Sequence, residues 1–228
     1  MYGFIDCDLL YSKRRMPIPN LEIMKLMAYY QEEKKEVCHL LLDPTPKLLS
    51  IYERVFVRSD FCKLEDLISR FPFLPSMTMG GKTFAKTYIP LEEELMEYMI
   101  PDPFIYQEWA DQKVAAGELT DKERDTFLNT PYFRAYYGSK RLPPPLLTKK
   151  RTALVYDEDF LAHSDWQEVL ETLKEHCRKV DFLYPLLCRK MSQVTLLQAI
   201  THLKADTEIV LDFSVPEDQY DYFIRKYK

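Results

Sequence analysis

Along the first third of the chain, short continuous apolar runs alternate with segments whose apolar residues recur at helical spacing. The apolar runs predict strands at residues 2–8, 36–42, 53–59 and 71–79. Apolar residues at helical spacing predict the helices between them, at residues 21–31, 47–52 and 64–70. Strands that alternate with helices pair in parallel through right-handed crossovers. The pattern therefore predicts an N-terminal Rossmann-like α/β unit with a parallel sheet.

Residues 100–150 break this alternation. Helices are predicted at residues 105–116 and, from a capping box at 120–123, just beyond them. An aromatic and basic stretch at 132–141 and a proline run at 143–145 follow. We interpret the stretch 132–141 as a brace that packs across a domain seam. Stacking of its rings on nucleic-acid bases or on a nucleotide is the alternative.

The last third of the chain resumes the alternation. Strands are predicted at residues 151–156, 179–182 and 208–213. Helices are predicted at residues 165–176, capped by Ser164, at 193–203, and from Pro216 onward. We therefore expect an α/β protein in three parts: a Rossmann-like domain at 1–100, a helical and Pro-rich connecting segment at 101–150, and a C-terminal βα unit, like a fragment of a barrel, at 151–228.

The composition narrows the classes of function. The chain has 228 residues, 46% of them hydrophobic, and a net charge of −5, so we expect no general attraction to nucleic acid or to anionic membranes. Only 5 residues are glycine, which disfavours Gly-rich phosphate loops and a bound dinucleotide. The sequence shows neither a signal-peptide pattern nor an apolar run long enough to cross a membrane. These features predict a cytoplasmic protein.

The cysteines and histidines do not have the spacing of metal ligands. No two of the 5 cysteines form a CxxC pair, the arrangement that zinc and iron–sulfur sites commonly use. The histidines form no HxH or HxxxH pair. We therefore expect reduced thiols, typical of the cytosol, and no metal or iron–sulfur site.

Polar residues and glycines follow the predicted strands, at the edge where parallel α/β sheets bind ligands. We expect a small anion or a protein partner to bind at this edge. The candidate residues are Asp6, Asp8, Arg58, Ser59, Gly80, Gly81, Asp157 and Asp159. Two alternatives remain open. The first is that these residues serve only as helix caps and turn residues. The second is that a partner docks on the predicted C-terminal helix, which carries the aromatic residues Tyr220, Tyr222, Phe223 and Tyr227.

Two of these pairs have a more specific prediction. Arg58 and Ser59 are expected to hold an anion at the N-terminus of the following helix. The alternative is that Arg58 lies at the surface and pairs with Asp60 or Glu65. The pair Gly80–Gly81 is expected to mark a bend where the backbone closely approaches another group.

The first strand ends in the pattern Asp-Cys-Asp. Two aspartates one residue apart serve as nucleophile and general acid in phosphoryl transfer, or together bind magnesium. Asp6 and Asp8 resemble the first motif of haloacid-dehalogenase-type phosphatases and, superficially, the opening of lesion-bypass DNA polymerases. Neither family's pattern continues further along the chain.

A longer resemblance covers about two thirds of the sequence. Residues 19–30 after the first strand, residues 52–59 and the glycine pair resemble, in this order, the start of a group of radical-SAM proteins. These proteins carry an N-terminal cobalamin-binding-like, Rossmann-like domain, and the group includes members from phages and mobile elements. Residues 154–162, 166–170 and 180–182 are similar to a βα stretch inside their partial barrel.

The chain departs from this family at the cofactor ligands. It has no CxxxCxxC motif for the iron–sulfur cluster and no DxHxxG motif for cobalamin. We therefore expect neither cofactor. The resemblance implies a degenerate, non-catalytic relative that binds a small anion or a protein partner. The alternative is a Mg-dependent phosphotransferase or phosphatase that uses Asp6 and Asp8.

Overall fold

The computed structural model describes residues 1–11, 18–71, 77–84, 100–144, 151–188 and 209–211. The chain forms two compact units, Met1–Asn129 and Thr130–Lys228, and each is described by itself. The three-part division at residues 100 and 150 stays a prediction. None of the described helices is both long enough and apolar enough to span a bilayer.

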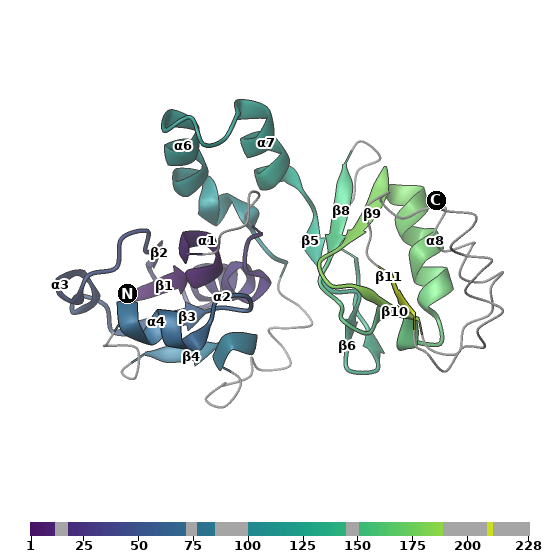
Figure 1. Cartoon of the computed structure of the whole chain (residues 1–228), viewed down its shortest axis with the longest axis horizontal. Coiled ribbons are helices and arrows are strands. Elements are labelled where there is room, and N and C mark those ends of the chain that lie inside the picture. The colour runs from purple at the N-terminus through teal and green to yellow at the C-terminus, as the bar shows by residue number, and fades with distance from the viewer. Residues whose placement is uncertain (12–17, 72–76, 85–99, 145–150, 189–208, 212–228) are drawn as a thin grey trace. The chain divides into compact units, whose positions relative to one another are not determined.

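The first unit contains the predicted parallel sheet. Its strands lie in the order β2-β1-β3-β4 and all neighbours pair in parallel (Figure 1). The strands are β1 (Tyr2–Asp6), β2 (Cys38–Leu40), β3 (Arg54–Arg58) and β4 (Thr78–Gly80). The register places Asp6 opposite Arg58 and Arg58 opposite Gly80. Three of the predicted site residues therefore lie side by side at the carboxyl end of the sheet.

Helices cover both faces of this sheet. They are α1 (Cys7–Tyr11), α2 (Leu21–Glu32), α3 (Pro46–Leu49) and α4 (Leu64–Arg70), followed after β4 by the 3-10 turn η2 (Lys82–Phe84). On one face, the rings of Phe4 and Phe56 stack 5.0 Å apart, and Tyr30 of α2 packs against both. On the other face, Ile5 and Val57 join residues of α3 and α4 in a second apolar core. Side chains alternate across a strand, so each strand supplies both cores.

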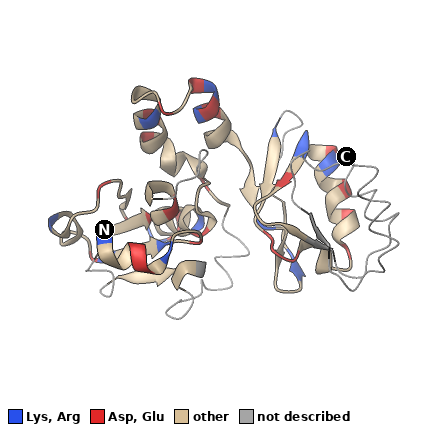
Figure 2. Ribbon diagram, viewed as in Figure 1, with Lys and Arg blue, Asp and Glu red and all other residues tan. Residues whose placement is uncertain are grey.

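The middle of the chain is helical, as predicted. It consists of η3 (Pro103–Tyr106), α6 (Gln107–Ala115) and α7 (Asp121–Asn129). The predicted capping box is confirmed, because Thr120 N donates to Glu123 Oε2 (2.8 Å) and Glu123 N to Thr120 Oγ1 (3.2 Å). Acidic and basic residues lie side by side on α6 and α7 (Figure 2), and ion pairs such as Arg124 with Asp111 (3.2 Å) join them.

The second unit contains a smaller parallel sheet, in the order β5-β8-β9. Its strands are β5 (Tyr132–Phe133), β8 (Thr152–Val155) and β9 (Lys179–Phe182). The other elements are the antiparallel pair β6 (Tyr136–Tyr137) and β7 (Lys140–Arg141), the turn η4 (Phe160–Ala162), the helix α8 (Trp166–His176), and the parallel pair β10 (Leu186–Cys188) and β11 (Ile209–Leu211).

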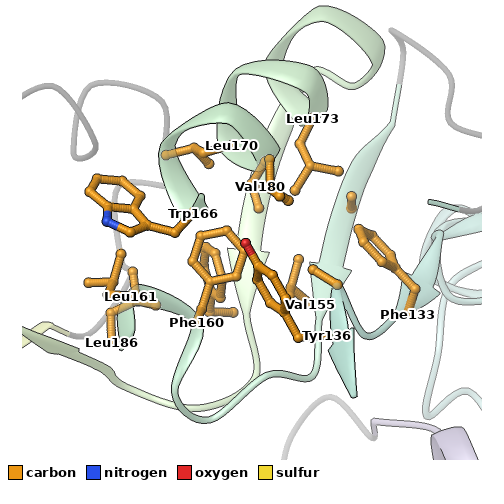
Figure 3. Close-up of a cluster of buried hydrophobic side chains, with 14 of the residues drawn as sticks. Phe133, Tyr136, Val155, Phe160, Leu161, Trp166, Leu170, Leu173, Val180 and Leu186 are labelled. Carbon is orange, nitrogen blue, oxygen red and sulfur yellow. The ribbon is translucent and has the colours of Figure 1, made fainter. Parts of the chain in front are cut away.

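One apolar core joins this sheet to α8. Leu170 and Leu173 of α8 face Val155 and Val180 of the strands, with Phe160 beside them (Figure 3). The structure thus confirms the predicted fold class, an α/β chain with an N-terminal parallel sheet, a helical middle and a small C-terminal parallel sheet.

Two local predictions are corrected. Residues 132–141 form β5 and the hairpin β6–β7, with Phe133 and Tyr136 in the apolar core of the second unit; that this stretch braces a domain seam stays a prediction. Ser164 does not cap α8, whose N-cap is Asp165 without a side-chain bond. The first strand ends at Asp6, because this side chain accepts from Leu9 N (3.0 Å) and caps α1. The predicted helices at 193–203 and after Pro216, with their aromatic residues, lie outside the described residues.

Candidate functional site

The Asp8 carboxylate is enclosed by the turn that leads from β3 to α4. Ser59 Oγ donates to it (2.8 Å), and so do the backbone N–H groups of Asp60 (2.6 Å), Phe61 (3.0 Å) and Cys62 (3.1 Å). Asp8 is only 4% exposed. The sequence predicts an anion at this turn, and the structure places the chain's own carboxylate there. Backbone N–H groups that converge in this way stabilise a negative charge.

The Asp6 carboxylate is also buried and accepts three hydrogen bonds. Its Oδ1 accepts from Leu9 N (3.0 Å), and its Oδ2 from Asn20 N (3.0 Å) and from the Tyr106 hydroxyl (2.7 Å). Tyr106 is fully buried and its hydroxyl also accepts from Asn20 N (3.1 Å). Asp6 therefore joins the end of β1, the start of α2 and the turn η3.

Burial and the nearby charge of Asp8 raise the pKa of Asp6 to about 7, against the three hydrogen bonds, which favour the charged form. Because the pKa of this carboxyl is higher in the folded than in the unfolded state, the folded protein retains the proton between about pH 4 and pH 7. Ionisation of Asp6 therefore destabilises the fold as the pH rises through this range.

We expect urea unfolding to reveal this ionisation. Asp6→Asn does not titrate, so its free energy of unfolding relative to wild type should rise between pH 4.5 and pH 7.5, by an amount on the order of a few kcal/mol. Tyr106→Phe removes a donor that favours the charged carboxylate and should extend the decline of wild-type stability above pH 7. An unchanged difference between wild type and Asp6→Asn across this range would contradict the assignment.

Arg58 is a buried cation that crosses the carboxyl end of β4. Its Nη1 donates to the carbonyls of Val57 (3.1 Å) and Thr78 (3.2 Å). Its Nε lies 3.0 Å from Glu22 Oε2, in the first turn of α2. A Cβ on Gly80 would lie 2.4 Å from Arg58 Cζ, so only glycine leaves room for the guanidinium. The close approach that the glycine pair predicts is this one.

Ser59 and Gly81 complete the same corner of the unit. Ser59 Oγ accepts from Thr83 Oγ1 (3.0 Å), and Ser59 O accepts from Thr83 N (3.0 Å). Gly81 adopts φ +90°, and a Cβ there would lie 2.3 Å from Ser59 O. At both glycines a side chain would collide with a neighbouring group, Arg58 at Gly80 and the Ser59 carbonyl at Gly81.

Asp157 and Asp159 lie in the second unit, after β8. Asp157 is buried and accepts from Ala135 N (2.7 Å) and Tyr136 N (3.0 Å). Burial raises its pKa, against these bonds and the charges of Arg134 and His163. Asp159 is exposed and caps η4 with its backbone carbonyl, which accepts from Ala162 N (2.9 Å). Asp157 thus anchors the start of the hairpin β6–β7.

Sequence reasoning missed several partners of these residues. Tyr106 lies 100 positions from Asp6 and gives no local signal. Glu22 and Thr83 likewise reach the site through the fold. Asn20 is identifiable as the cap of α2, and its side chain does accept from Glu22 N and Ile23 N, but its backbone bond to Asp6 has no pattern in the sequence.

Two further observations bear on ligands. Among the described residues, no three His, Cys, Asp or Glu side chains gather closely enough to hold a metal ion. A hollow of about 310 Å³ lies at the amino ends of β3 and β4, with Leu49, Tyr52, Val55 and Met77 in its walls. It is at the opposite ends of these strands from Asp6 and Arg58.

Comparison of the chain with protein-family models, with curated proteins and with solved structures finds no match.

Proposed function

We propose that this chain is a non-catalytic protein that binds a small anion or a protein partner. One observation carries the proposal: both carboxylates of the Asp-Cys-Asp motif are buried, and each of their oxygens accepts hydrogen bonds from the chain itself. In this arrangement the chain's own donors occupy the oxygens of both Asp6 and Asp8.

The same observation weighs against the alternative, a Mg-dependent phosphotransferase. A nucleophilic carboxylate must have one oxygen open to the phosphorus atom, and Asp6 is only 1% exposed. Magnesium needs carboxylate oxygens with room for several water molecules around the ion. The donors around Asp8 occupy the positions that such a hydrated ion would take.

We further propose that the scaffold is a degenerate form of the radical-SAM proteins with a cobalamin-binding-like domain. The parallel order β2-β1-β3-β4 supports a Rossmann-like first unit. Where the resemblance would place a cysteine motif, after β5, the chain has the hairpin β6–β7, which contains no cysteine. This hairpin and the missing DxHxxG motif support binding without either cofactor.

A turnover assay tests the proposal. We expect purified protein with MgCl₂ to release no phosphate above background from p-nitrophenyl phosphate or from a panel of sugar phosphates and nucleotides. In a thermal-shift screen without magnesium, at least one small anion should raise the melting temperature saturably. Magnesium-dependent phosphate release that Asp6→Asn abolishes, while its circular dichroism stays that of wild type, would establish the enzyme instead.

A further inference from the structure

We propose that Arg134 binds the oxyanion group of a small ligand, a phosphate or a carboxylate, at the carboxyl end of β5. The inference rests on the proposed binding function and assigns it a site within the second unit. Arg134 directly follows β5 (Tyr132–Phe133), and Asp157 follows the neighbouring strand β8. Both residues therefore lie at the edge where parallel α/β sheets bind ligands.

The guanidinium of Arg134 lacks the acidic partners that Arg141 and Arg124 have. Its Nε is buried without a hydrogen-bond partner, and no hydrogen bond or ion pair joins Arg134 to another of the described residues. By contrast, Arg141 lies 2.6 Å from Glu168 and Arg124 lies 3.2 Å from Asp111. A guanidinium stays charged at every physiological pH and has five donors to satisfy. A buried donor without an acceptor is costly, so an external acceptor accounts for it best.

Asp157 follows the strand next to β5, but both of its carboxylate oxygens already accept hydrogen bonds. They accept from Ala135 N (2.7 Å) and Tyr136 N (3.0 Å), which fixes the carboxylate toward the backbone of the hairpin. The charges of Arg134 and His163 nevertheless both favour the ionised form of Asp157 and act to lower its pKa. The ring of His163 stacks on Tyr136, with centroids 3.6 Å apart. A second basic side chain therefore lies against the hairpin strand β6 that follows Arg134 in the chain.

The shape of the guanidinium indicates the chemistry of the ligand. Its planar fork of N–H groups matches two oxygens of one carboxylate or phosphate group, which an ammonium does not. Arg134 is half-buried as a whole, so part of the residue stays open to solvent. We therefore expect a ligand that presents two oxygens of one group to this edge.

An NMR titration of the full chain tests this site. In ¹⁵N-labelled protein at constant ionic strength, the Nε–Hε signal that is missing from Arg134→Lys identifies Arg134. We expect this signal to shift saturably with sodium phosphate or with sodium acetate. The anion that binds more tightly shows whether the natural ligand presents a phosphate or a carboxylate group. Sodium chloride should produce no saturable shift. Arg134→Lys keeps the charge but loses the fork, and should weaken binding at least tenfold.

Arg141→Lys is the matched control, because Arg141 lies in the same unit and is paired with Glu168. This variant should bind the anion as wild type does. Arg134→Met adds a second measurement: its melting temperature should equal or exceed that of wild type without the anion, and the anion should no longer raise it. Equal saturable binding by wild type and Arg134→Lys, or no saturable shift with either anion, overturns the site.

These outcomes are separate from a failure of the proposed function. Saturable binding that Arg134→Lys leaves unchanged removes the site but leaves a binding protein. Magnesium-dependent turnover that requires Asp6 removes the proposed function, whatever Arg134 binds.

Discussion

Replacement of Asp8 by Ala is expected to destabilise the protein by about 3–5 kcal/mol, the range for removing one partner from a buried charged network. The Ser59 hydroxyl and the backbone N–H groups of Asp60, Phe61 and Cys62 all lose their acceptor. Each buried donor left without a partner costs about 1–3 kcal/mol. Because these donors form the turn before α4, the whole corner between β3 and α4 depends on one side chain.

Asp8→Asn refines this prediction. Asp8 Oδ1 accepts from three of the four donors, and only Asp60 N donates to Oδ2. An asparagine whose oxygen takes the Oδ1 position keeps those three bonds and presents an amide N–H₂ to Asp60 N. Its cost should therefore be about 1–3 kcal/mol, clearly less than that of Asp8→Ala.

Urea unfolding followed by circular dichroism measures both variants. Asp66→Ala is the control, because Asp66 lies exposed in the first turn of α4 and its side chain accepts none of the bonds in this turn. It should change the stability little. The prediction is wrong if Asp8→Ala unfolds at the same urea concentration as Asp66→Ala.

Gly81→Ala should be the most damaging of the glycine substitutions, with a loss of about 4 kcal/mol or more. Two effects combine at this position. The residue adopts φ +90°, which L side chains rarely adopt, and its new Cβ would meet Ser59 O at 2.3 Å. The obstacle is backbone, so no side-chain rotation relieves it. A shift of Ser59 would also disturb its bond to Asp8.

Gly117→Ala separates the two effects. Gly117 ends the helical turn after α6 with φ +72°, and a Cβ there would meet nothing within 4 Å. This substitution should cost about 1–2 kcal/mol, the strain of the left-handed backbone alone. The comparison is again made by urea unfolding, and equal losses for the two variants would show that the contact with Ser59 O yields without cost.

The sequence predicts most elements of this fold because their signals are local. Helix α4 has the predicted bounds, Leu64–Arg70, and so does strand β9, Lys179–Phe182. The capping box at Thr120 and the Asn20 cap depend on neighbours within three residues. Parallel topology then follows from the alternation of strands and helices, and it brings the polar strand ends to one edge.

What the sequence does not predict is whether these polar groups face solvent or the interior. The donors to Asp8 come from residues 51–54 positions away, and the hydroxyl that bonds Asp6 comes from Tyr106. Such partners are set by tertiary packing alone. The hairpin β6–β7 was detectable, because Gly138–Ser139 is a two-residue turn signal, but the basic and aromatic residues around it favour other interpretations.

The bond between Asp6 and Tyr106 has a consequence for protein synthesis. Asp6 leaves the ribosome 100 residues before its shortest hydrogen-bond donor. At roughly 5–20 residues per second, the first strand waits about 5–20 seconds for that donor. Once Gly80 has also been made, the nascent chain has the four strands of the first sheet but not yet the hydroxyl that donates to the carboxylate at the end of β1. The order of translation thus supplies the donor on η3 only after all four strands of this sheet have been made.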